Sequence, residues 1–272
     1  MVEILDCRPL AEKIKNEVLN DYKKLNKSIN LAVFLVGDDP ASKIYVRNKE
    51  KLCLELGIQA HVHNLPHDIE EEILLDKIFW FNFFDSCRGI LVQLPLPAHI
   101  NRNNVIQAIN PDKDVDCFHP VNLGKLCLGE CFLIPPTSAA VLYVLDYCKI
   151  DLTGKHVVII NDTIILGRPL SHLLLTKSAT VTICNRYTLN LPEICRSADV
   201  IVTAVGKRDY FVLNNAYCKQ GVVIIDVGIS KFKGKTVGDV NIDDVSNARL
   251  VTKVPYGIGA LTIPFLLKNL VK

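Results

Sequence analysis

The sequence predicts an α/β protein made of two domains, each with a parallel sheet covered by helices. Short apolar runs of strand length alternate with longer segments of helical pattern along the chain. The first of these runs, residues 31–36, ends in Gly37-Asp38-Asp39-Pro40, as expected for a buried strand and its loop. A chain of 272 residues, 49% of them hydrophobic, is long enough for each of two domains to bury a core. We therefore expect two α/β domains with a cleft between them.

The first half of the chain repeats a strand–loop–helix unit. An opening helix begins at Pro9, and its apolar residues recur in steps of four. After the buried strand, Pro40 and Gly57 mark the start and the end of a second helix. In order, the expected elements are a helix over 9–25, a strand over 31–36, a helix between Pro40 and Gly57, a strand over 59–65, a helix over 70–83 and a strand over 89–94.

The overall composition excludes several classes of function. The net charge is +2 and no basic run is present, so nothing predicts binding to nucleic acid or to a membrane. The first residues lack the apolar core of a signal peptide, and no apolar run reaches the length of a membrane span. The 10 cysteines are scattered without a CxxC pair, which argues against a metal site and favours buried thiols in a reducing compartment. We expect a cytoplasmic protein without a metal.

The helix after Pro40 carries a candidate catalytic face. Ser42, Tyr45 and Lys49 are spaced by three and four residues and would project from one side of the helix. A hydroxyl, a phenol ring and an ammonium in one row can stack a flat ligand and offer it a proton donor, and the pKa of a lysine falls when it is partly buried. Taken alone, the same pattern also fits a solvated helix face.

Two further segments add polar side chains to this region. The strand over 89–94 ends in Gln93-Leu94-Pro95-Leu96-Pro97, and ligands of open α/β sheets gather beyond the carboxyl ends of strands. Asp116 follows in Pro111-Asp-Lys-Asp-Val-Asp116, and a carboxylate there can accept paired hydrogen bonds from an amino-pyrimidine ring. Considered alone, Gln93 fits a satisfied loop amide equally well.

These three segments, in this order, resemble the methylenetetrahydrofolate dehydrogenase/cyclohydrolase family. That family has a helix with Tyr and Lys separated by three residues, a strand end Gln-Leu-Pro-Leu-Pro and a segment Lys-Asp-Val-Asp-Gly-Phe-His-Pro. The present chain has Tyr45 and Lys49, then Gln93–Pro97, then Lys113–Pro120 with Cys117 at the usual glycine. Three motifs in order are far more specific than any one of them.

The resemblance implies that 5,10-methylenetetrahydrofolate is oxidised to the methenyl form and then hydrolysed to 10-formyltetrahydrofolate, as in one-carbon metabolism and purine biosynthesis. The hydride passes to a nicotinamide cofactor. By the same resemblance, Tyr45 stacks on the folate and Asp116 binds its pterin edge. Lys49 polarises or protonates the reacting centre, and Gln93 orients the lysine. These four are the expected catalytic residues, and the expected substrate-binding residues are Ser42, Tyr45, Leu94, Pro95, Asp116, Pro255 and Gly259.

The second half of the chain has the pattern of a Rossmann-like nucleotide-binding domain. Residues 157–160 form an apolar run typical of a buried strand, and the loop after them turns into a helix whose N-terminus would present N–H groups to a phosphate. The loop lacks the GxGxxG fingerprint. It resembles the family's Gly-Arg-Ser-x-x-Val-Gly-x-Pro, with Asn161, Asp162 and Thr163 in place of Gly, Arg and Ser. Further strands are expected over 180–184, 199–204 and 222–227.

The residues give opposing signals about the choice between NADP and NAD. Asp162 would repel the 2′-phosphate of NADP and bind a free ribose hydroxyl, which favours NAD. Arg186 would bind that phosphate in a bidentate way, with Arg168 assisting. Charge-assisted bonds are about twice as strong as neutral ones, so we expect a weak preference for NADP. The expected cofactor-binding residues are Asn161, Asp162, Thr163, Gly167, Arg168, Pro169, Asn185, Arg186, Ala204, Val205, Gly206, Asp226 and Gly228.

The C-terminal part completes the pattern. Residues 253–262 resemble the family's Thr-Pro-Val-Pro-Gly-Gly-Val-Gly-Pro-Met-Thr, with Tyr256 at a glycine position, where a bulky residue would reshape the folate pocket or force a different turn. A helix is expected from Leu261. We predict a catalytic folate-binding domain over 1–136 with the C-terminal helix 259–272, and an NAD(P)-binding domain over 137–258. The resemblance also implies a homodimer formed through the second domain.

Three other interpretations stay open at this point. The changes at Asn161–Thr163 fit a cofactor loop that has decayed, leaving only the cyclohydrolase. The chain also fits an inactive family member that binds a partner or forms dimers, although the intact set of Tyr45, Lys49, Gln93 and Asp116 argues against it. A shikimate-type nicotinamide dehydrogenase has a similar two-domain build, but the folate-type segments at both ends of the chain argue against that reading.

Overall fold

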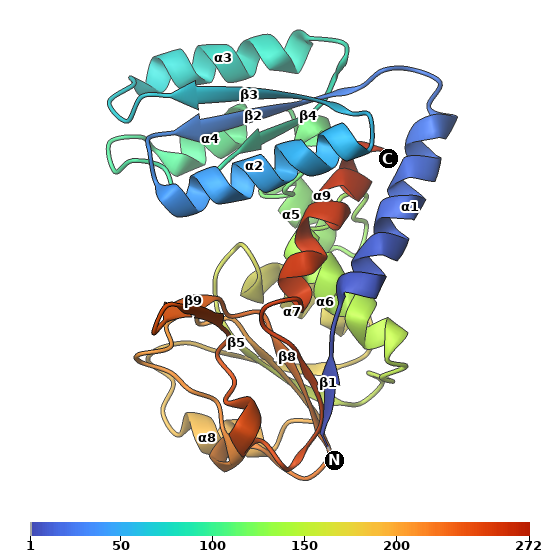
Figure 1. Cartoon of the computed structure of the whole chain (residues 1–272), viewed down its shortest axis with the longest axis vertical. Helices are drawn as coiled ribbons and strands as arrows, with labels where there is room; N and C mark the ends of the chain where they lie inside the picture. The colour runs from blue at the N-terminus through green and yellow to red at the C-terminus, as the bar shows by residue number, and fades with distance from the viewer. Residues whose placement is uncertain (1) are drawn as a thin grey trace. The chain divides into compact units, whose positions relative to one another are not determined.

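The computed structural model describes residues 2–272 and contains two compact units (Figure 1). The three-stranded unit comprises Lys13–Lys125, Cys131–Pro136 and Ile263–Lys272. The six-stranded unit comprises the residues up to Glu12, Leu126–Glu130 and Thr137–Thr262. Each unit has a parallel sheet with helices against it, so the predicted α/β fold of two domains is confirmed. No helix among the described residues is both long enough and apolar enough to cross a membrane.

The three-stranded unit has a parallel sheet in the order β3-β2-β4. Its central strand β2 is buried along its whole length, because helices cover both faces of the sheet. Figure 1 shows α3 on one face and α2 on the other. The elements are β2 (Asn30–Val36), α2 (Pro40–Glu55), β3 (Gln59–Leu65), α3 (Glu71–Phe83), β4 (Cys87–Val92), α4 (Arg102–Ala108), η1 (Pro111–Lys113) and α5 (Pro120–Cys127).

The helix α9 (Thr262–Leu270) is bound into this unit by its side chains. Asn269 is buried, and its Nδ2 donates to the carbonyl of Val115 at 2.9 Å. Leu270 packs closely against Gly89 of β4, where an added Cβ would lie 2.6 Å from Leu270 Cδ1. A larger residue than glycine at that position would displace the helix. The helix predicted from Leu261 therefore completes the core of a unit that is otherwise formed by the first half of the chain.

The six-stranded unit has a parallel sheet in the order β1-β11-β8-β7-β5-β6. The strand order reverses at β5, which has β6 on one side and β7 on the other. The elements are β1 (Glu3–Leu5), α6 (Pro136–Tyr147), β5 (His156–Ile160), α7 (Gly167–Leu175), β6 (Thr180–Cys184), α8 (Leu191–Arg196), β7 (Val200–Thr203), η2 (Asn215–Tyr217), β8 (Val222–Asp226), β9 (Ser230–Phe232), β10 (Lys235–Val237), η3 (Ile242–Asp244), β11 (Ala248–Thr252) and η4 (Ile258–Ala260).

The N-terminal residues belong to this second sheet. Strand β1 pairs in parallel with β11, with Glu3 opposite Leu250. The division between the units therefore falls between residues 12 and 13, inside α1 (Arg8–Lys24). We expected the beginning of the chain in the first domain, because a strand of three residues is too short to show a period in the sequence.

Candidate active site

Lys49 on α2 and Gln93 just after β4 are joined by a hydrogen bond. The Lys49 ammonium donates to Gln93 Oε1 over 3.0 Å. The other end of the Gln93 amide, Nε2, donates to the carbonyl of Leu94 over 2.7 Å. The amide is thus held at both ends, and its oxygen faces the lysine. Helix α2 and strand β4 lie far apart in the sequence, and the parallel sheet brings the end of one beside the other.

Burial shifts the proton affinity of Lys49 and of Asp116 in opposite directions. It lowers the pKa of Lys49 from its ordinary value, and the attraction of Asp116 offsets part of this effect. It raises the pKa of Asp116 to about 6, although Lys49 acts to lower it. Within residues 2–272, no side chain or N–H group donates a hydrogen bond to the Asp116 carboxylate, so its oxygens are free to accept bonds from a ligand.

The structure distinguishes Asp116 from the aspartates that precede it. Asp112 is exposed. Asp114 is buried, and its Oδ2 accepts hydrogen bonds from the backbone N–H of His119 at 2.7 Å and from Asn122 Nδ2 at 3.1 Å. Asp114 therefore stabilises the segment, whereas Asp116 keeps its acceptors unused. The described residues contain no group of three or more His, Cys, Asp or Glu side chains that could hold a metal ion.

The two other polar residues of the α2 face lie in different environments. Tyr45 is 43% exposed, so its ring is available to stack on a ligand. Ser42 is only 4% exposed and lies in the first turn of the helix, where its backbone N–H donates to Asp39 Oδ2 over 2.7 Å. The Ser42 side chain is thus buried beside the cap residue Asp39, whereas Tyr45 on the same helix is exposed. A contact between Ser42 and the substrate stays a prediction.

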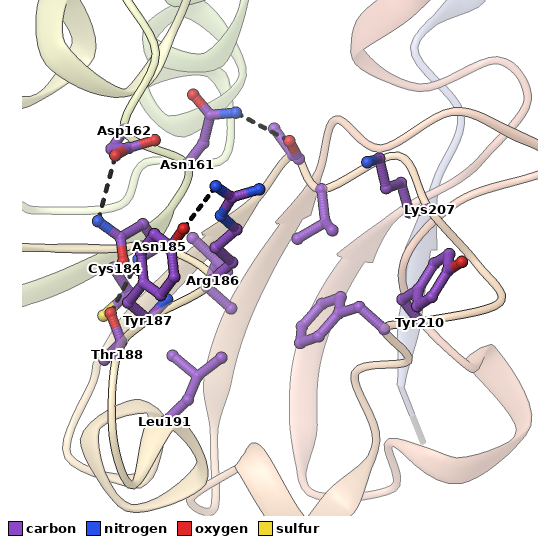
Figure 2. Close-up of a pocket in the computed structure, with 14 residues that line it drawn as sticks. Asn161, Asp162, Cys184, Asn185, Arg186, Tyr187, Thr188, Leu191, Lys207 and Tyr210 are labelled. Atoms are coloured by element: carbon purple, nitrogen blue, oxygen red, sulfur yellow. Dashed lines mark hydrogen bonds between the residues drawn. The ribbon is translucent and has the colours of Figure 1, made fainter.

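A pocket of about 840 Å³ opens at the carboxyl ends of β5, β6 and β7 in the six-stranded unit (Figure 2). It lies where the strand order reverses, the position at which open α/β sheets bind ligands. Its volume lies within the range of small-molecule and cofactor sites. The predicted cofactor-binding residues that line it are Asn161, Asp162, Asn185, Arg186, Ala204 and Val205. Its other polar or aromatic lining residues, which the sequence analysis did not name, are Tyr187, Thr188, Lys207, Tyr210 and Phe211.

The two residues with opposing signals for the cofactor are held by different neighbours (Figure 2). Asp162 Oδ2 accepts a hydrogen bond from Asn185 Nδ2 at 3.2 Å. Arg186 Nη2 donates to the hydroxyl of Tyr187 over 2.5 Å, and its Cζ lies 4.6 Å from the centre of the Tyr187 ring. In the part of the chain that the structure describes, no carboxylate forms a salt bridge with Arg186. Its charge is therefore available to a ligand.

Hydrogen bonds within the loop between β5 and α7 fix its conformation. Asn161 Oδ1 accepts hydrogen bonds from the backbone N–H groups of Thr163 at 3.0 Å and Gly167 at 3.1 Å. We expected N–H groups here to face a phosphate, but these two are already bonded. A Cβ on Gly167 would lie 1.8 Å from the Asn161 carbonyl oxygen, so the loop requires glycine. Arg168 is exposed, and its Nε donates to the Asp162 carbonyl over 2.9 Å.

Asp226 does not line the pocket, nor do Pro169, Gly206 and Gly228 from the same predicted set. Asp226 is 2% exposed and accepts backbone hydrogen bonds from Gly228 at 2.9 Å and Val240 at 2.9 Å. Burial raises its pKa to about 7. The carboxylate is thus bonded inside the protein, away from the cofactor pocket.

A neighbouring carboxylate, which the sequence analysis did not include among the site residues, shapes the pocket. Asp239 is buried and accepts hydrogen bonds from Thr203 Oγ1 at 2.8 Å, from Val205 N–H at 2.7 Å and from Gly206 N–H at 2.9 Å. It therefore fixes the segment that supplies the Val205 wall. The available sequence signal was the segment Gly238-Asp239-Val240. In the structure Gly228 leaves room for this carboxylate, since a Cβ there would lie 2.2 Å from Asp239 Cγ.

The loop after β11 contains the other two predicted substrate-binding residues, Pro255 and Gly259, and both are exposed. Between them, Tyr256 has a φ of +81°, which is the left-handed conformation that glycine prefers. The guanidinium of Arg8 lies 4.4 Å from the centre of its ring, and its carbonyl accepts the N–H of Cys7 at 2.7 Å. These contacts hold Tyr256 in the backbone conformation that glycine prefers.

Two family models match the chain, one in each half. Residues 5–116 match the family model described as tetrahydrofolate dehydrogenase/cyclohydrolase, catalytic domain. Residues 135–272 match the model described as tetrahydrofolate dehydrogenase/cyclohydrolase, NAD(P)-binding domain. The chain belongs to the tetrahydrofolate dehydrogenase/cyclohydrolase family.

Relatives of this family match along almost the whole chain. The bifunctional protein FolD of Ruminiclostridium cellulolyticum is 46% identical over 275 residues, which cover 99% of this chain and 96% of the relative. The crystal structure of the bifunctional FolD enzyme of Campylobacter jejuni has a TM-score of 0.95 and 42% identity, and covers 100% of this chain and 98% of its own. The Trypanosoma brucei enzyme, described as complexed with NADP cofactor and inhibitor, has a TM-score of 0.92 and 32% identity, and covers 99% and 96%.

This member of the tetrahydrofolate dehydrogenase/cyclohydrolase family is therefore an enzyme with two activities. It oxidises 5,10-methylenetetrahydrofolate to the methenyl form with NAD(P)⁺ and hydrolyses the methenyl form to 10-formyltetrahydrofolate. The shikimate-type interpretation and the non-enzymatic interpretation are thereby excluded.

Proposed function

We propose that Lys49, Gln93, Asp116 and Tyr45 carry both steps, and that Arg186 makes NADP the preferred hydride acceptor. The observation that carries the first part is the 3.0 Å hydrogen bond from Lys49 to Gln93. It fixes a partly buried ammonium whose pKa burial has lowered. A lysine of lowered pKa gives and accepts a proton more readily near neutral pH, as general acid–base catalysis requires.

Each residue of this cluster has a separate task in the proposal. The exposed ring of Tyr45 stacks on the folate, and the unused oxygens of Asp116 accept hydrogen bonds from its pterin edge. Lys49 polarises the reacting centre and exchanges a proton with it as water adds to the methenyl bridge. Gln93 keeps the ammonium directed at that centre. The nicotinamide cofactor, when bound, accepts the hydride.

The pocket at the ends of β5, β6 and β7 fits a dinucleotide in volume and in chemistry. Arg186 has no carboxylate partner in the described chain, whereas one oxygen of Asp162 is already bonded to Asn185. The same pocket is thus lined by a cation with unused N–H groups and by a carboxylate that is partly satisfied, which favours the 2′-phosphate of NADP over a free hydroxyl. The Trypanosoma brucei relative is described with NADP, which supports this proposal.

Absorbance of the reduced cofactor, recorded with methylenetetrahydrofolate and either NADP or NAD, tests this assignment. We expect turnover with both and a higher kcat/KM with NADP, and we expect the Arg186→Leu variant to reverse that order. The Arg249→Leu variant is the matched control, since Arg249 is an exposed arginine of the same unit that does not line the pocket. Decay of supplied methenyltetrahydrofolate without any reduction of either cofactor would instead show a decayed cofactor loop. Loss of both activities in the intact protein would overturn the proposal.

We also propose the finer organisation that the resemblance implies. Residues 1–136 with 259–272 serve as the folate domain and 137–258 as the NAD(P) domain. The enzyme acts in the cytoplasm as a homodimer formed through the second domain, and its product supplies purine biosynthesis. Sedimentation velocity checks the dimer, which should have twice the 30.3 kDa mass of one chain. A single species at the mass of one chain contradicts it.

A further inference from the structure

We propose that Tyr187 is a positioning residue for cofactor choice, because it holds Arg186 in an ordered pose at the rim of the pocket and so strengthens binding of a ligand with a 2′-phosphate. The proposal rests on the assignment of Arg186 made above. Tyr187 follows Arg186 directly in the sequence, and both side chains are exposed, with Tyr187 71% exposed.

The side chains of Arg186 and Tyr187 contact each other directly. Tyr187 meets the guanidinium in two ways, through the hydrogen bond from Nη2 at 2.5 Å and through the ring centre, which lies 4.6 Å from Cζ. An arginine over the face of an aromatic ring is attracted to it even at an exposed site. Figure 2 shows the Arg186 guanidinium with its Tyr187 bond among the residues that line the pocket.

Hydrogen bonds within residues 185–188 fix the backbone that carries this pair. The loop from 185 to 188 is a closed turn, in which Asn185 Oδ1 accepts the N–H of Tyr187 at 2.9 Å and Asn185 N–H donates to Thr188 Oγ1 over 2.9 Å. The Tyr187 ring therefore projects from a fixed point. Asn185 also donates to Asp162, so the same turn engages the competing carboxylate.

The guanidinium of Arg186 keeps N–H groups that have no partner in the described chain. Tyr187 uses Nη2, and no other hydrogen bond or ion pair of Arg186 exists within residues 2–272. Nη2 carries two N–H groups, and the one that Tyr187 leaves unused is parallel to an N–H of Nε or of Nη1, so a pair remains for two parallel bonds to a phosphate. A free exposed arginine loses much side-chain entropy on binding, and a neighbour that already restricts it reduces that loss. Tyr187 thus contributes to phosphate binding without contacting the phosphate.

The test uses two nucleotides that differ only in the 2′-phosphate, adenosine 2′,5′-bisphosphate and adenosine 5′-monophosphate, with dissociation constants measured by calorimetry. The Tyr187→Leu variant should bind the bisphosphate about 5-fold more weakly and the monophosphate within about 2-fold of the wild type. The Tyr187→Phe variant keeps the ring and should fall between the two. Tyr147→Leu is the matched control, because Tyr147 is an exposed tyrosine of the same unit and does not line the pocket.

A double-mutant cycle separates positioning from a general effect on the pocket. Arg186→Leu should weaken the bisphosphate at least about 10-fold, and adding Tyr187→Leu should weaken it no further. Equal weakening of both nucleotides by Tyr187→Leu, or tighter binding of the bisphosphate, overturns the inference. If Arg186→Leu itself leaves bisphosphate binding unchanged, the assignment of Arg186 fails first, and the inference fails with it.

Discussion

Lys49 and Arg186 are both cations placed to meet a ligand, yet one is partly buried and the other is exposed. Burial lowers the pKa of Lys49, and it raises the pKa of the nearby Asp116 to about 6. Arg186 instead lies at the rim of a pocket against an exposed tyrosine. Proton transfer requires a group whose two protonation states are close in free energy, which burial provides. Recognition of a phosphate requires only a charge of fixed sign in the right place.

The largest effect should come from Lys49→Ala, which removes the proton donor. Cyclohydrolase kcat should fall by about 10²- to 10⁴-fold, the usual contribution of a general acid or base. The matched control is Lys51→Ala on the same helix, whose side chain is 76% exposed and lies 3.9 Å from Glu55. It should retain activity within about 2-fold. Undiminished methenyltetrahydrofolate hydrolysis in Lys49→Ala would refute the role.

Asp116→Asn should raise the KM for the folate by about 10- to 100-fold at neutral pH, since bonds to a charged acceptor are lost. In the wild type, the KM should rise as the pH falls below about 6, because the protonated carboxyl no longer accepts two bonds. The variant should lack this dependence. Steady-state kinetics between pH 5 and 8 tests both statements, and an acid limb that persists in the variant contradicts them.

The raised pKa of Asp116 acts on stability in the opposite direction: deprotonation, which favours folate binding, makes the folded protein less stable. The pKa of Asp116 in the folded protein lies above its ordinary value of 3.8, so the folded protein loses stability as the pH rises from 3.8 through about 6. At pH 8 the Asp116→Asn variant should therefore melt no lower than the wild type. This thermal measurement also verifies that the kinetic loss does not come from unfolding.

Gln93 variants should move the alkaline limit of activity in opposite directions. Gln93→Leu removes the acceptor at 3.0 Å from the ammonium, so the pKa of Lys49 falls further and the alkaline limb moves to lower pH. Gln93→Glu places an anion there and moves the limb to higher pH. We expect a loss of roughly 10-fold in kcat for Gln93→Leu, because the lysine is less well directed. If both variants shifted the alkaline limb of the pH profile in the same direction, Gln93 would act only through packing.

The smallest effect is expected from salt, and it contrasts the two regions directly. Raising the ionic strength from about 0.1 to 1 M shortens the screening length from about 10 to 3 Å. The KM for NADP should rise roughly 3- to 10-fold because Arg186 is exposed. Cyclohydrolase kcat should change by less than about 2-fold because Lys49 is partly buried. A rise in the KM for NAD as large as that for NADP would contradict the assignment.

The sequence predicted the regular elements well where an apolar run has clear limits. The strands expected over 59–65 and 180–184 have those bounds in β3 and β6. It did not predict β1 or the β9–β10 hairpin, each of whose strands has only three residues. A strand of that length shows no period, and only its partner makes it a strand. β1 exists because β11, far along the chain, pairs with it.

The candidate site was predictable where side-chain spacing decides it, and not where backbone packing decides it. Helical spacing placed Tyr45 and Lys49 on one face, but it could not show that Ser42 is buried in the first turn of the helix. An aspartate at a strand end is typical of a nucleotide site, yet Asp226 bonds to buried backbone N–H groups. A different turn at Tyr256 was one expectation, and Tyr256 adopts the glycine-like φ of +81° itself, while its effect on the shape of the folate pocket stays a prediction.

The attachment of α9 makes the three-stranded unit depend on a distant segment of the chain. Most of this unit lies before residue 126, yet the Asn269 and Leu270 contacts come from the last helix. Removal of α9 would therefore open the core of the unit that is encoded first, and not the core of the unit that α9 follows in the sequence.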